Sequence, residues 1–220
     1  MSGLISGPTR VRVKVCGVTR LEDAQDAWEA GADALGLNFC ARSPRCVSPE
    51  AAAALARTRP PFGSVVGVFV DEAPARIRAL VAQCGLGAVQ LHGEEPPEQC
   101  RGYGVPVIKA VRVRGPADVA RARAYVGAGD VRALLLDGAS PGQGVGFDWA
   151  LLEPLRGCGL PLLVAGGLTP QNVEAAVRAT RPYGVDVASG VERAPGLKDP
   201  RAVRAFVRAA QTPFMQEPHP

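Results

Sequence analysis

The sequence predicts an α/β fold, namely a single (β/α)8 TIM barrel with eight parallel strands. Short β-branched runs alternate with alanine- and arginine-rich helical stretches along residues 11–210. Most of these runs are continuously apolar, as is typical of strands that are covered on both faces. The chain has 220 residues, and barrels of about 200–250 residues form a single domain.

Eight strand–helix units follow one another, and each strand is indicated by a β-branched or leucine-rich run. In chain order, the expected strands are 11–16, 34–39, 64–70, 88–92, 106–111, 133–137, 161–165 and 185–188. Several helices carry proline in the first turn, where its missing N–H is harmless. The expected helices are 21–30, 49–57, 73–83, 96–101, 116–125, 149–156, 170–179 and 200–210. Eight such units close most simply into a barrel.

An open, doubly wound sheet is the structural alternative. It ranks lower because a dinucleotide-binding sheet carries G-x-G-x-x-G after its first strand, whereas this chain reads GVTR there. No linker-like or low-complexity stretch interrupts the alternating pattern. We therefore expect one barrel domain over 11–210, with loose extensions at 1–10 and 211–220.

Composition and charge exclude several classes of protein. Hydrophobic residues make up 47% of the chain and the net charge is only +4, which excludes intrinsic disorder. The basic residues form no cluster, so no nucleic-acid partner is expected. The N-terminal MSGLISGPTR lacks the pattern of a signal peptide, and no apolar run approaches the roughly 18 residues of a spanning helix. We expect a cytoplasmic protein without a membrane partner.

Cysteine and lysine are informative through their spacing and scarcity. The six cysteines form no C-x-x-C pair and no cysteine–histidine metal spacing, so no metal is expected and the thiols should be reduced. Only three of the 25 basic residues are lysine, namely Lys14, Lys109 and Lys198. Their scarcity directs attention to the positions they occupy.

Two loops predict a phosphate site. On such a barrel, chemistry is built at the C-terminal ends of the strands, and phosphate often binds after strands seven and eight. Gly166 and Gly167 follow the seventh strand, and Ser189 and Gly190 follow the eighth. Glycine lets backbone N–H groups approach a phosphate, and a helix N-terminus adds positive partial charge. Either loop alone could simply turn the chain, but their joint position favours phosphate.

A third glycine-rich loop follows the sixth strand and contains Gly142 and Gly144. It could add further N–H donors to the phosphate site. It could instead be a mobile lid, and the residues by themselves leave both interpretations open.

Cys16 ends the first strand and shares a strand face with Lys14, because side chains alternate between faces. An ammonium beneath the thiol favours the thiolate and lowers the pKa of the cysteine, as a base or nucleophile requires. Cys16 could instead be a small buried hydrophobic residue. Lys14 could equally be a structural cation paired with Asp186 of the eighth strand, and both roles can hold at once.

Three further polar residues stand at strand ends or in the loops that follow. Asp137 emerges from the apolar run of the sixth strand, where a carboxyl can act as a general acid or cap a loop. His92 follows Gln90 on one face of the fourth strand, in a polar core network or in catalysis. Arg45 lies after the second strand, where its guanidinium could bind a substrate carboxylate or face solvent.

Read together, these stretches resemble phosphoribosylanthranilate isomerase of tryptophan biosynthesis. The resemblance covers nearly all of residues 11–200, and the ordered set of stretches is far more specific than any one of them. They are VKVCGVT at 13–19, GADALG at 31–36, SPR at 43–45, VGVFV at 66–70, VQLHGE at 89–94, VIKA at 107–110, LLD at 135–137, FDW at 147–149, AGGLTPQNV at 165–173 and VDVASGVE at 185–192.

The resemblance implies a reaction and the residues for it. It implies the Amadori rearrangement of N-(5-phosphoribosyl)anthranilate to 1-(2-carboxyphenylamino)-1-deoxyribulose 5-phosphate, without metal or cofactor, by a monomer or homodimer. The family's general base falls on Cys16, its general acid on Asp137 and its carboxylate-binding arginine on Arg45. Its phosphate loops fall on the glycines that follow the last two strands.

The chain departs from the family pattern at two places. The usual Gly-Gly-Thr-Gly after the sixth strand is PGQG at 141–144, which puts the contact of Gly142 and Gly144 with phosphate in doubt. The usual Ser-Ser before the glycine of the eighth loop is Ala188-Ser189, which removes one hydroxyl but leaves the backbone donors.

Two other functions compete with this interpretation. A histidine-pathway phosphoribosyl isomerase resembles two fused half-barrels and has an aspartate at the end of strand one. In this chain the first strand ends in Cys16, and the two halves of the sequence do not visibly repeat. A non-catalytic barrel that only binds a phosphorylated ligand would have little reason to keep Cys16, Asp137 and Arg45 at three separate strand ends.

Overall fold

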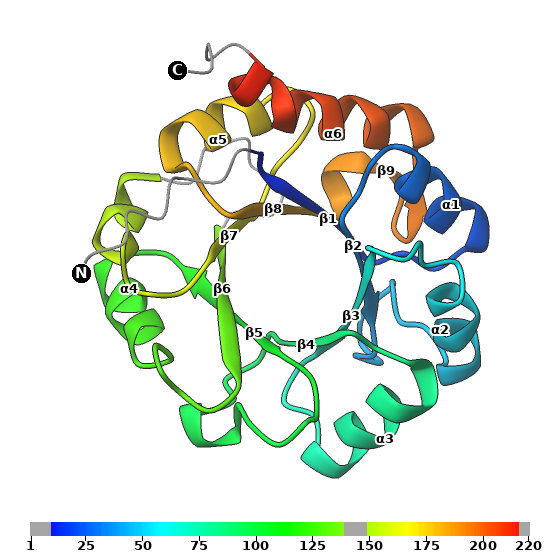
Figure 1. The fold of residues 1–220 in the computed structure, drawn as a ribbon, viewed down its shortest axis with the longest axis horizontal. Coiled ribbons are helices and arrows are strands. Elements are labelled where there is room, and N and C mark those ends of the chain that lie inside the picture. The colour runs from blue at the N-terminus through cyan, green and yellow to red at the C-terminus, as the bar shows by residue number, and fades with distance from the viewer. Residues whose placement is uncertain (1–9, 139–148, 216–220) are drawn as a thin grey trace.

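The computed structural model describes residues 10–138 and 149–215, and the strands of this part close into a parallel eight-stranded barrel (Figure 1). Neighbouring strands pair in chain order, and β1 closes the ring against β8. The strands are β1 (Arg12–Cys16), β2 (Ala34–Asn38), β3 (Ser64–Phe69), β4 (Ala88–Leu91), β5 (Val107–Val113), β6 (Val131–Gly138), β7 (Leu162–Ala165) and β8 (Gly184–Val187). The predicted barrel is confirmed, and the doubly wound alternative is wrong.

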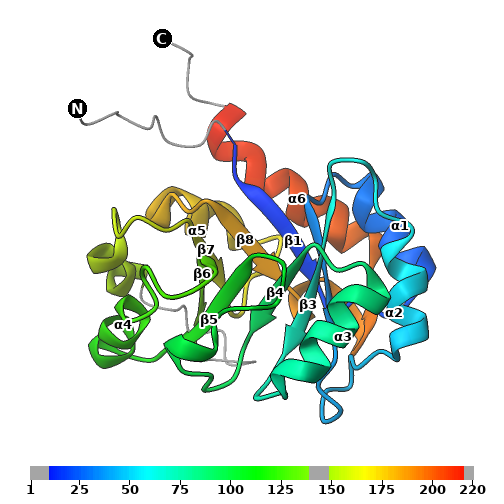
Figure 2. The ribbon, with the colours of Figure 1, turned by 60° about the horizontal axis from the view of Figure 1, so that its bottom comes forward.

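The helices lie outside the ring of strands (Figures 1 and 2). They are α1 (Leu21–Glu29), α2 (Pro49–Ala56), α3 (Pro74–Cys84), α4 (Pro116–Arg123), α5 (Val173–Thr180) and α6 (Pro200–Met215). Helix α2 illustrates the local signals, because Ser48 caps it by accepting a hydrogen bond from the Ala51 N–H and Pro49 opens its first turn. None of the helices in the described part of the chain has the length and apolar character needed to span a bilayer.

Two of the expected helices are wrong in type. The segments expected as helices at 96–101 and 149–156 form short 3-10 helices instead, η1 (Pro97–Gln99) and η2 (Trp149–Leu155). Pro96 and Pro97 supply no N–H donors at the start of the first, and Pro154 lies inside the second. Pro154 cannot donate an i→i−4 hydrogen bond inside the second segment. In the first, the N–H groups of Gln99 and Cys100 bond to the carbonyls three residues back, and the chain turns away at Gly102, which has φ +78°.

The last connection contains structure that the sequence did not predict. After β8 the chain forms a short 3-10 turn, η3 (Ser189–Val191), and then a small antiparallel hairpin of β9 (Glu192–Ala194) and β10 (Leu197–Lys198). This hairpin lies beside β1 and α1 (Figure 1). It leads directly into α6, which packs between α5 and α1 and so completes the outer ring.

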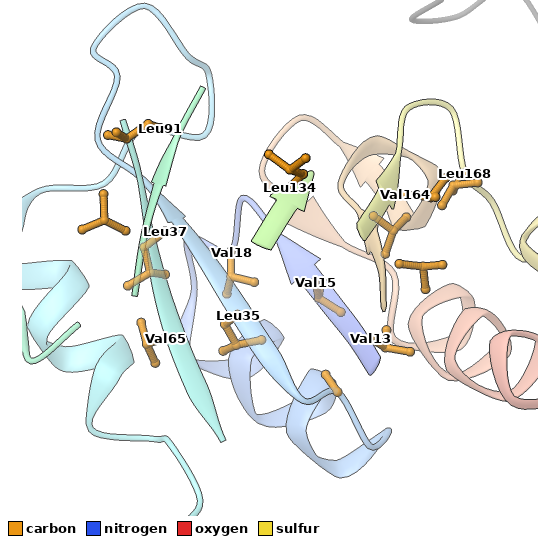
Figure 3. Packing of buried hydrophobic residues seen from close by; sticks show 14 of the residues in the cluster. Val13, Val15, Val18, Leu35, Leu37, Val65, Leu91, Leu134, Val164 and Leu168 are labelled. Carbon is orange, nitrogen blue, oxygen red and sulfur yellow. The ribbon is translucent and has the colours of Figure 1, made fainter. Parts of the chain in front are cut away.

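The core has an apolar outer layer and a more polar interior. Between strands and helices, outward-facing side chains such as Val15 of β1 and Leu37 of β2 form one continuous cluster (Figure 3). Inside the ring, a small cluster of alanine and leucine from β5, β6 and β7 fills one side. Lys14, Gln90 and Asp186 are buried in the barrel wall as well. The floor beneath the C-terminal strand ends is therefore polar on the side of β1, β4 and β8.

Candidate active site

A cavity of about 380 Å³ opens where the strands end. It collects predicted site residues from separate strand ends and the loops that follow them, as a barrel site requires. They are Cys16, Arg45, His92, Asp137, Gly166, Gly167, Asp186, Ser189 and Gly190. Lys14 is buried in β1 near Cys16, and Gly142 and Gly144 lie outside the described residues.

Lys14 and Asp186 form a buried ion pair near the predicted base. The β1–β8 register places the two residues opposite each other, and Lys14 Nζ donates to Asp186 Oδ1 at 2.9 Å. Burial disfavours the ammonium, but the Asp186 carboxylate and Cys16 together raise the pKa of Lys14, so that it stays charged. The pairing expected from the sequence is present, and it does not prevent Lys14 from interacting with the Cys16 sulfur.

The pKa of Cys16 is raised above the ordinary value of a cysteine thiol. Burial raises the pKa of the thiol, and the nearby Asp186 carboxylate raises it further. Lys14 acts in the expected direction and lowers it, but does not outweigh burial. Gly36 of β2 makes room for this arrangement, since a Cβ there would lie 2.7 Å from Cys16 Sγ and 3.0 Å from Lys14 Nζ. The lowering by Lys14 that the sequence predicts is therefore present, and burial, which the sequence does not show, sets the net direction.

Asp137 is held by a short polar chain. Gln90 Nε2 lies 2.9 Å from His92 Nδ1, and His92 Nε2 lies 3.2 Å from Asp137 Oδ2. His92 therefore bridges Gln90 and Asp137, and the donor and acceptor roles of its two ring nitrogens are set by its tautomer. The Gln90 side-chain oxygen is buried and has no hydrogen-bond partner within the described part of the chain. The chain thus orients Asp137 toward the cavity from β4.

The glycine-rich loops are packed too closely for side chains. Gly166 has φ +89°, and a Cβ there would collide with the Gly138 backbone and lie 2.7 Å from Asp137 Oδ1. A Cβ at Gly190 would collide with the Leu168 carbonyl oxygen. Gly167 also has a positive φ, which glycine adopts without strain. The end of β6 and the loops after β7 and β8 therefore converge, and the backbone amides of the two loops are the groups through which they can bind an anion.

Arg45 reaches the cavity from the loop after β2, and one edge of its guanidinium is occupied. Nε donates to Glu192 Oε1 at 2.8 Å, and Nη2 donates to Glu192 Oε2 at 2.6 Å. A guanidinium has five N–H donors, so further donors remain for a ligand. Gly17 is required here, because it has φ +71° and a Cβ would collide with the Arg45 side chain.

Sequence reasoning missed several residues that line the cavity or support it. Arg112 lies in register with Asp137 and lines the cavity together with Arg114. Side chains alternate along β5, so Arg112 faces the same side as Ile108 and Ala110. This alternation could have identified Arg112, but the expected strand stopped at residue 111. Glu192, which binds Arg45, ends the stretch VDVASGVE that carries the resemblance, but nothing in the sequence indicated its pairing with Arg45.

Within the described residues, no group of three or more histidine, cysteine, aspartate or glutamate side chains is arranged to hold a metal ion. The ionisable groups that line the cavity are a thiol, two carboxyls, an imidazole and three guanidinium groups. Such a set can transfer protons and bind anions.

Comparisons with known proteins agree with this arrangement. A family model described as N-(5'phosphoribosyl)anthranilate (PRA) isomerase matches residues 13–209. The chain is 71% identical over 205 residues to the N-(5'-phosphoribosyl)anthranilate isomerase of Myxococcus xanthus, covering 92% of this chain and 97% of that protein. It is 49% identical over 205 residues to that of Geobacter sulfurreducens, covering 91% and 98%.

Solved structures give the same result. The phosphoribosyl anthranilate isomerase of Thermotoga maritima superposes with a TM-score of 0.86 at 45% identity, covering 91% of this chain and 98% of that one. Another such isomerase, solved in complex with reduced 1-(o-carboxyphenylamino)-1-deoxyribulose 5-phosphate, superposes with a TM-score of 0.83 at 44% identity, covering 91% and 98%.

Proposed function

The chain belongs to the N-(5'-phosphoribosyl)anthranilate isomerase family, and from this premise we propose how its residues carry out the reaction. The chain catalyses the Amadori rearrangement of N-(5-phosphoribosyl)anthranilate to 1-(2-carboxyphenylamino)-1-deoxyribulose 5-phosphate in tryptophan biosynthesis. One observation carries the assignment of roles: a single cavity brings Cys16, Asp137 and Arg45 together with the glycine-rich loops.

The two anionic ends of the substrate bind at different sides of this cavity. The phosphate accepts hydrogen bonds from the backbone amides of the loops that contain Gly166, Gly167 and Gly190, and from Ser189. The carboxylate of the anthranilate ring binds the free donors of Arg45. The ribose then lies between the two anchors, where Cys16 and Asp137 line the cavity from β1 and β6.

Asp137 acts as the general acid and Cys16 as the general base. Asp137, in its protonated form, donates to the furanose ring oxygen while the anilino nitrogen forms a double bond to C1, which opens the ring to an iminium. The cation acidifies the C2 proton, which the Cys16 thiolate removes to give an enolamine. Ketonisation of the enolamine yields the product, so that no atom is lost or gained. Each positioned proton transfer typically contributes about 10²- to 10⁴-fold.

The surroundings of the two groups support these roles. His92 contacts Asp137 Oδ2 and holds the carboxyl in one orientation. Burial keeps the Cys16 thiol mostly protonated in the resting protein, but a cationic iminium close to the sulfur favours the thiolate at the moment when the base is needed. Lys14 is also positively charged, like the iminium, and lies beside the Cys16 sulfur.

Replacing the two groups tests the assignment. We expect Cys16→Ala and Asp137→Asn each to lower kcat by at least about a hundredfold, since each removes one proton transfer. The measurement is the loss of substrate fluorescence, with circular dichroism and thermal unfolding as controls for the fold. Near-full turnover in either variant would remove that residue from the mechanism. A separate assay of the unmodified protein with the histidine-pathway substrate tests which substrate it takes.

The oligomeric state and the cellular location of the chain are a separate part of the proposal. One solved relative, 42% identical, is described as monomers generated from the dimeric phosphoribosylanthranilate isomerase of Thermotoga maritima. We propose that this chain is a monomer or a homodimer located in the cytoplasm, where its six free cysteines would stay reduced. Sedimentation velocity and cell fractionation test the two statements.

A further inference from the structure

Lys198 is one of the most deeply buried charged residues of the chain, with 1% of its surface exposed. It ends the β9–β10 hairpin, which is tied to the first strand–helix unit at two points. The Lys198 backbone N–H donates to Asp23 Oδ2 at 3.0 Å, and Thr19 Oγ1 donates to the Gly196 carbonyl at 2.6 Å. The position of the lysine is therefore set by the hairpin and not by its own flexible side chain.

The Lys198 ammonium has three acceptors. Nζ donates to the Cys16 carbonyl at 2.6 Å, to the Ala188 carbonyl at 3.1 Å and to Glu192 Oε1 at 2.8 Å. An ammonium has three N–H groups, so all of its donors are used. Two of these acceptors lie at the ends of β1 and β8, where the ring closes, and the third belongs to the residue that binds Arg45.

Glu192 connects the lysine to Arg45. Its side chain is only 4% exposed, and its two oxygens accept from Arg45, Lys198 and the Gly196 N–H. Burial opposes the charge, but the hydrogen bonds from Arg45 and Lys198 lower the pKa of Glu192, so that it remains ionised. An ionised, fully bonded Glu192 fixes the direction of the Arg45 guanidinium.

The charges of Arg45, Glu192 and Lys198 matter as much as the positions of these side chains. An Arg45–Glu192 pair by itself has no net charge, and its carboxylate would repel a second carboxylate nearby. Burial lowers the pKa of Lys198, while its hydrogen bond to Glu192 acts against that shift. With Lys198 in its ammonium form, one carboxylate lies between two cations and the group carries a net charge of +1. That net charge is what an incoming carboxylate requires.

We propose that Lys198 and Glu192 are positioning residues for the substrate carboxylate: Glu192 orients Arg45, and Lys198 supplies the charge that keeps Arg45 available. This inference rests on the proposed role of Arg45. It assigns part of the specificity for a carboxylated aniline to two residues that lie behind the arginine, outside the lining of the cavity.

The chain contains a matched control on the other side of the barrel. Lys109 is also 1% exposed, and its Nζ donates to Glu95 Oε2 at 2.7 Å, to the Gly93 carbonyl at 2.7 Å and to the Leu91 carbonyl at 3.3 Å. The remaining bonds of Glu95 come from backbone N–H groups, not from an arginine. Lys109→Met therefore breaks an equivalent buried pair that has no connection to Arg45.

The experiment compares two substrates across four variants. The substrates are N-(5-phosphoribosyl)anthranilate and N-(5-phosphoribosyl)aniline, which lacks the carboxylate, and product is quantified by chromatography. The variants are Arg45→Gln, Lys198→Met, Glu192→Asp and Lys109→Met. Glu192→Asp keeps the charge but shortens the reach to Arg45, so it separates position from charge and remains informative should Lys198→Met not fold.

We expect Lys198→Met and Glu192→Asp each to lower kcat/KM for the carboxylated substrate about tenfold, mainly through KM, and for the aniline analogue less than about threefold. Lys109→Met should change both substrates by the same factor, because a purely structural loss does not distinguish them. Equal factors for both substrates in Glu192→Asp, or in a folded Lys198→Met, would overturn the inference.

The Arg45→Gln variant separates the two levels of the proposal. If Arg45→Gln abolishes the preference for the carboxylated substrate but Lys198→Met and Glu192→Asp retain it, the inference about Lys198 and Glu192 is wrong and the role of Arg45 stands. When Arg45→Gln itself keeps the preference, the role of Arg45 and the inference built on it are both wrong.

Discussion

Cys16 stands beside two opposite charges whose effects on its thiol have opposite signs. Lys14 lowers the pKa of the thiol, whereas Asp186 and burial raise it. The residue is therefore mostly protonated in the resting protein, and its ionisation depends on a balance that single substitutions can tip in either direction.

This balance predicts opposite shifts in the pH profile of kcat. In the proposed mechanism the thiolate is the active form, so the rising limb of the profile should follow the pKa of Cys16. Lys14→Met removes the group that lowers this pKa and should move the limb to higher pH. Asp186→Asn removes a group that raises it and should move the limb to lower pH. Turnover at saturating substrate between about pH 6 and about pH 10 measures both, and shifts in the same direction would contradict the assignment of Cys16 as base.

Gly190 offers a second test at the scale of one residue. Because a Cβ at this position would collide with the Leu168 carbonyl, Gly190→Ala must displace one of the two loops that we propose bind the phosphate. We expect KM to rise about tenfold, with a smaller change in kcat, since the phosphate anchors ground and transition states alike. Gly115→Ala is the control, because nothing lies within 4 Å of a Cβ there. A KM unchanged in Gly190→Ala would exclude this loop from phosphate binding.

At the scale of elements, α6 joins the end of the barrel to its beginning. It packs against α5 and α1, and Gln211 donates a hydrogen bond to the Val11 carbonyl at 2.8 Å. Phe206 on this helix is completely buried. The helix therefore covers the seam between β8 and β1, which carries Lys14 and Asp186 on its inner side.

We expect Phe206→Ala to lower the free energy of unfolding by about 3–5 kcal/mol, as a cavity in a packed core does. KM should stay the same, because α6 is separated from the cavity by the strands. Urea denaturation measures the first quantity and steady-state kinetics the second. Phe62→Ala is a matched control of the same chemistry on a fully exposed side chain, and it should change stability by less than about 0.5 kcal/mol. A loss of similar size in both variants would contradict this account of α6.

For the whole molecule, the distribution of charge should guide the substrate to the site. The chain carries a net charge of +4, and the cavity is lined by Arg45, Arg112 and Arg114, whereas the substrate is an anion at both ends. Long-range attraction of this kind raises the association rate and is screened by salt.

We expect kcat/KM to fall several-fold between about 20 mM and about 500 mM salt, with kcat nearly constant. In Arg112→Gln/Arg114→Gln this salt dependence should be weaker, because two of the three cavity guanidinium groups are gone. Arg204→Gln on the outer helix α6 is the control and should leave the slope unchanged. The same slope in all three proteins would show that the cavity charges do not steer the substrate.

Local patterns account for most of what could be predicted. Alternating β-branched and helical stretches identified all eight strands, and glycines at the expected strand ends identified loops that do line the cavity. Two helices were wrong: Pro154 lies inside the segment at 149–155 and cannot donate a helical hydrogen bond, and the segment at 97–99 ends after one turn, before Gly102 with its positive φ. Arg112 was missed because the end of its strand was placed one residue too early for the alternation to reach it.

The sequence by itself determined the barrel, the order of its strands and the positions of Cys16 and Asp137 at strand ends, because these follow from short-range periodicity. Only the tertiary structure decided the direction of the Cys16 pKa and the partners of Arg45. Glu192 lies 147 residues from Arg45, and Lys198 lies 182 residues from the Cys16 carbonyl that it binds. Burial and pairwise charge arise when the ring closes and brings such residues together, so no local pattern encodes them.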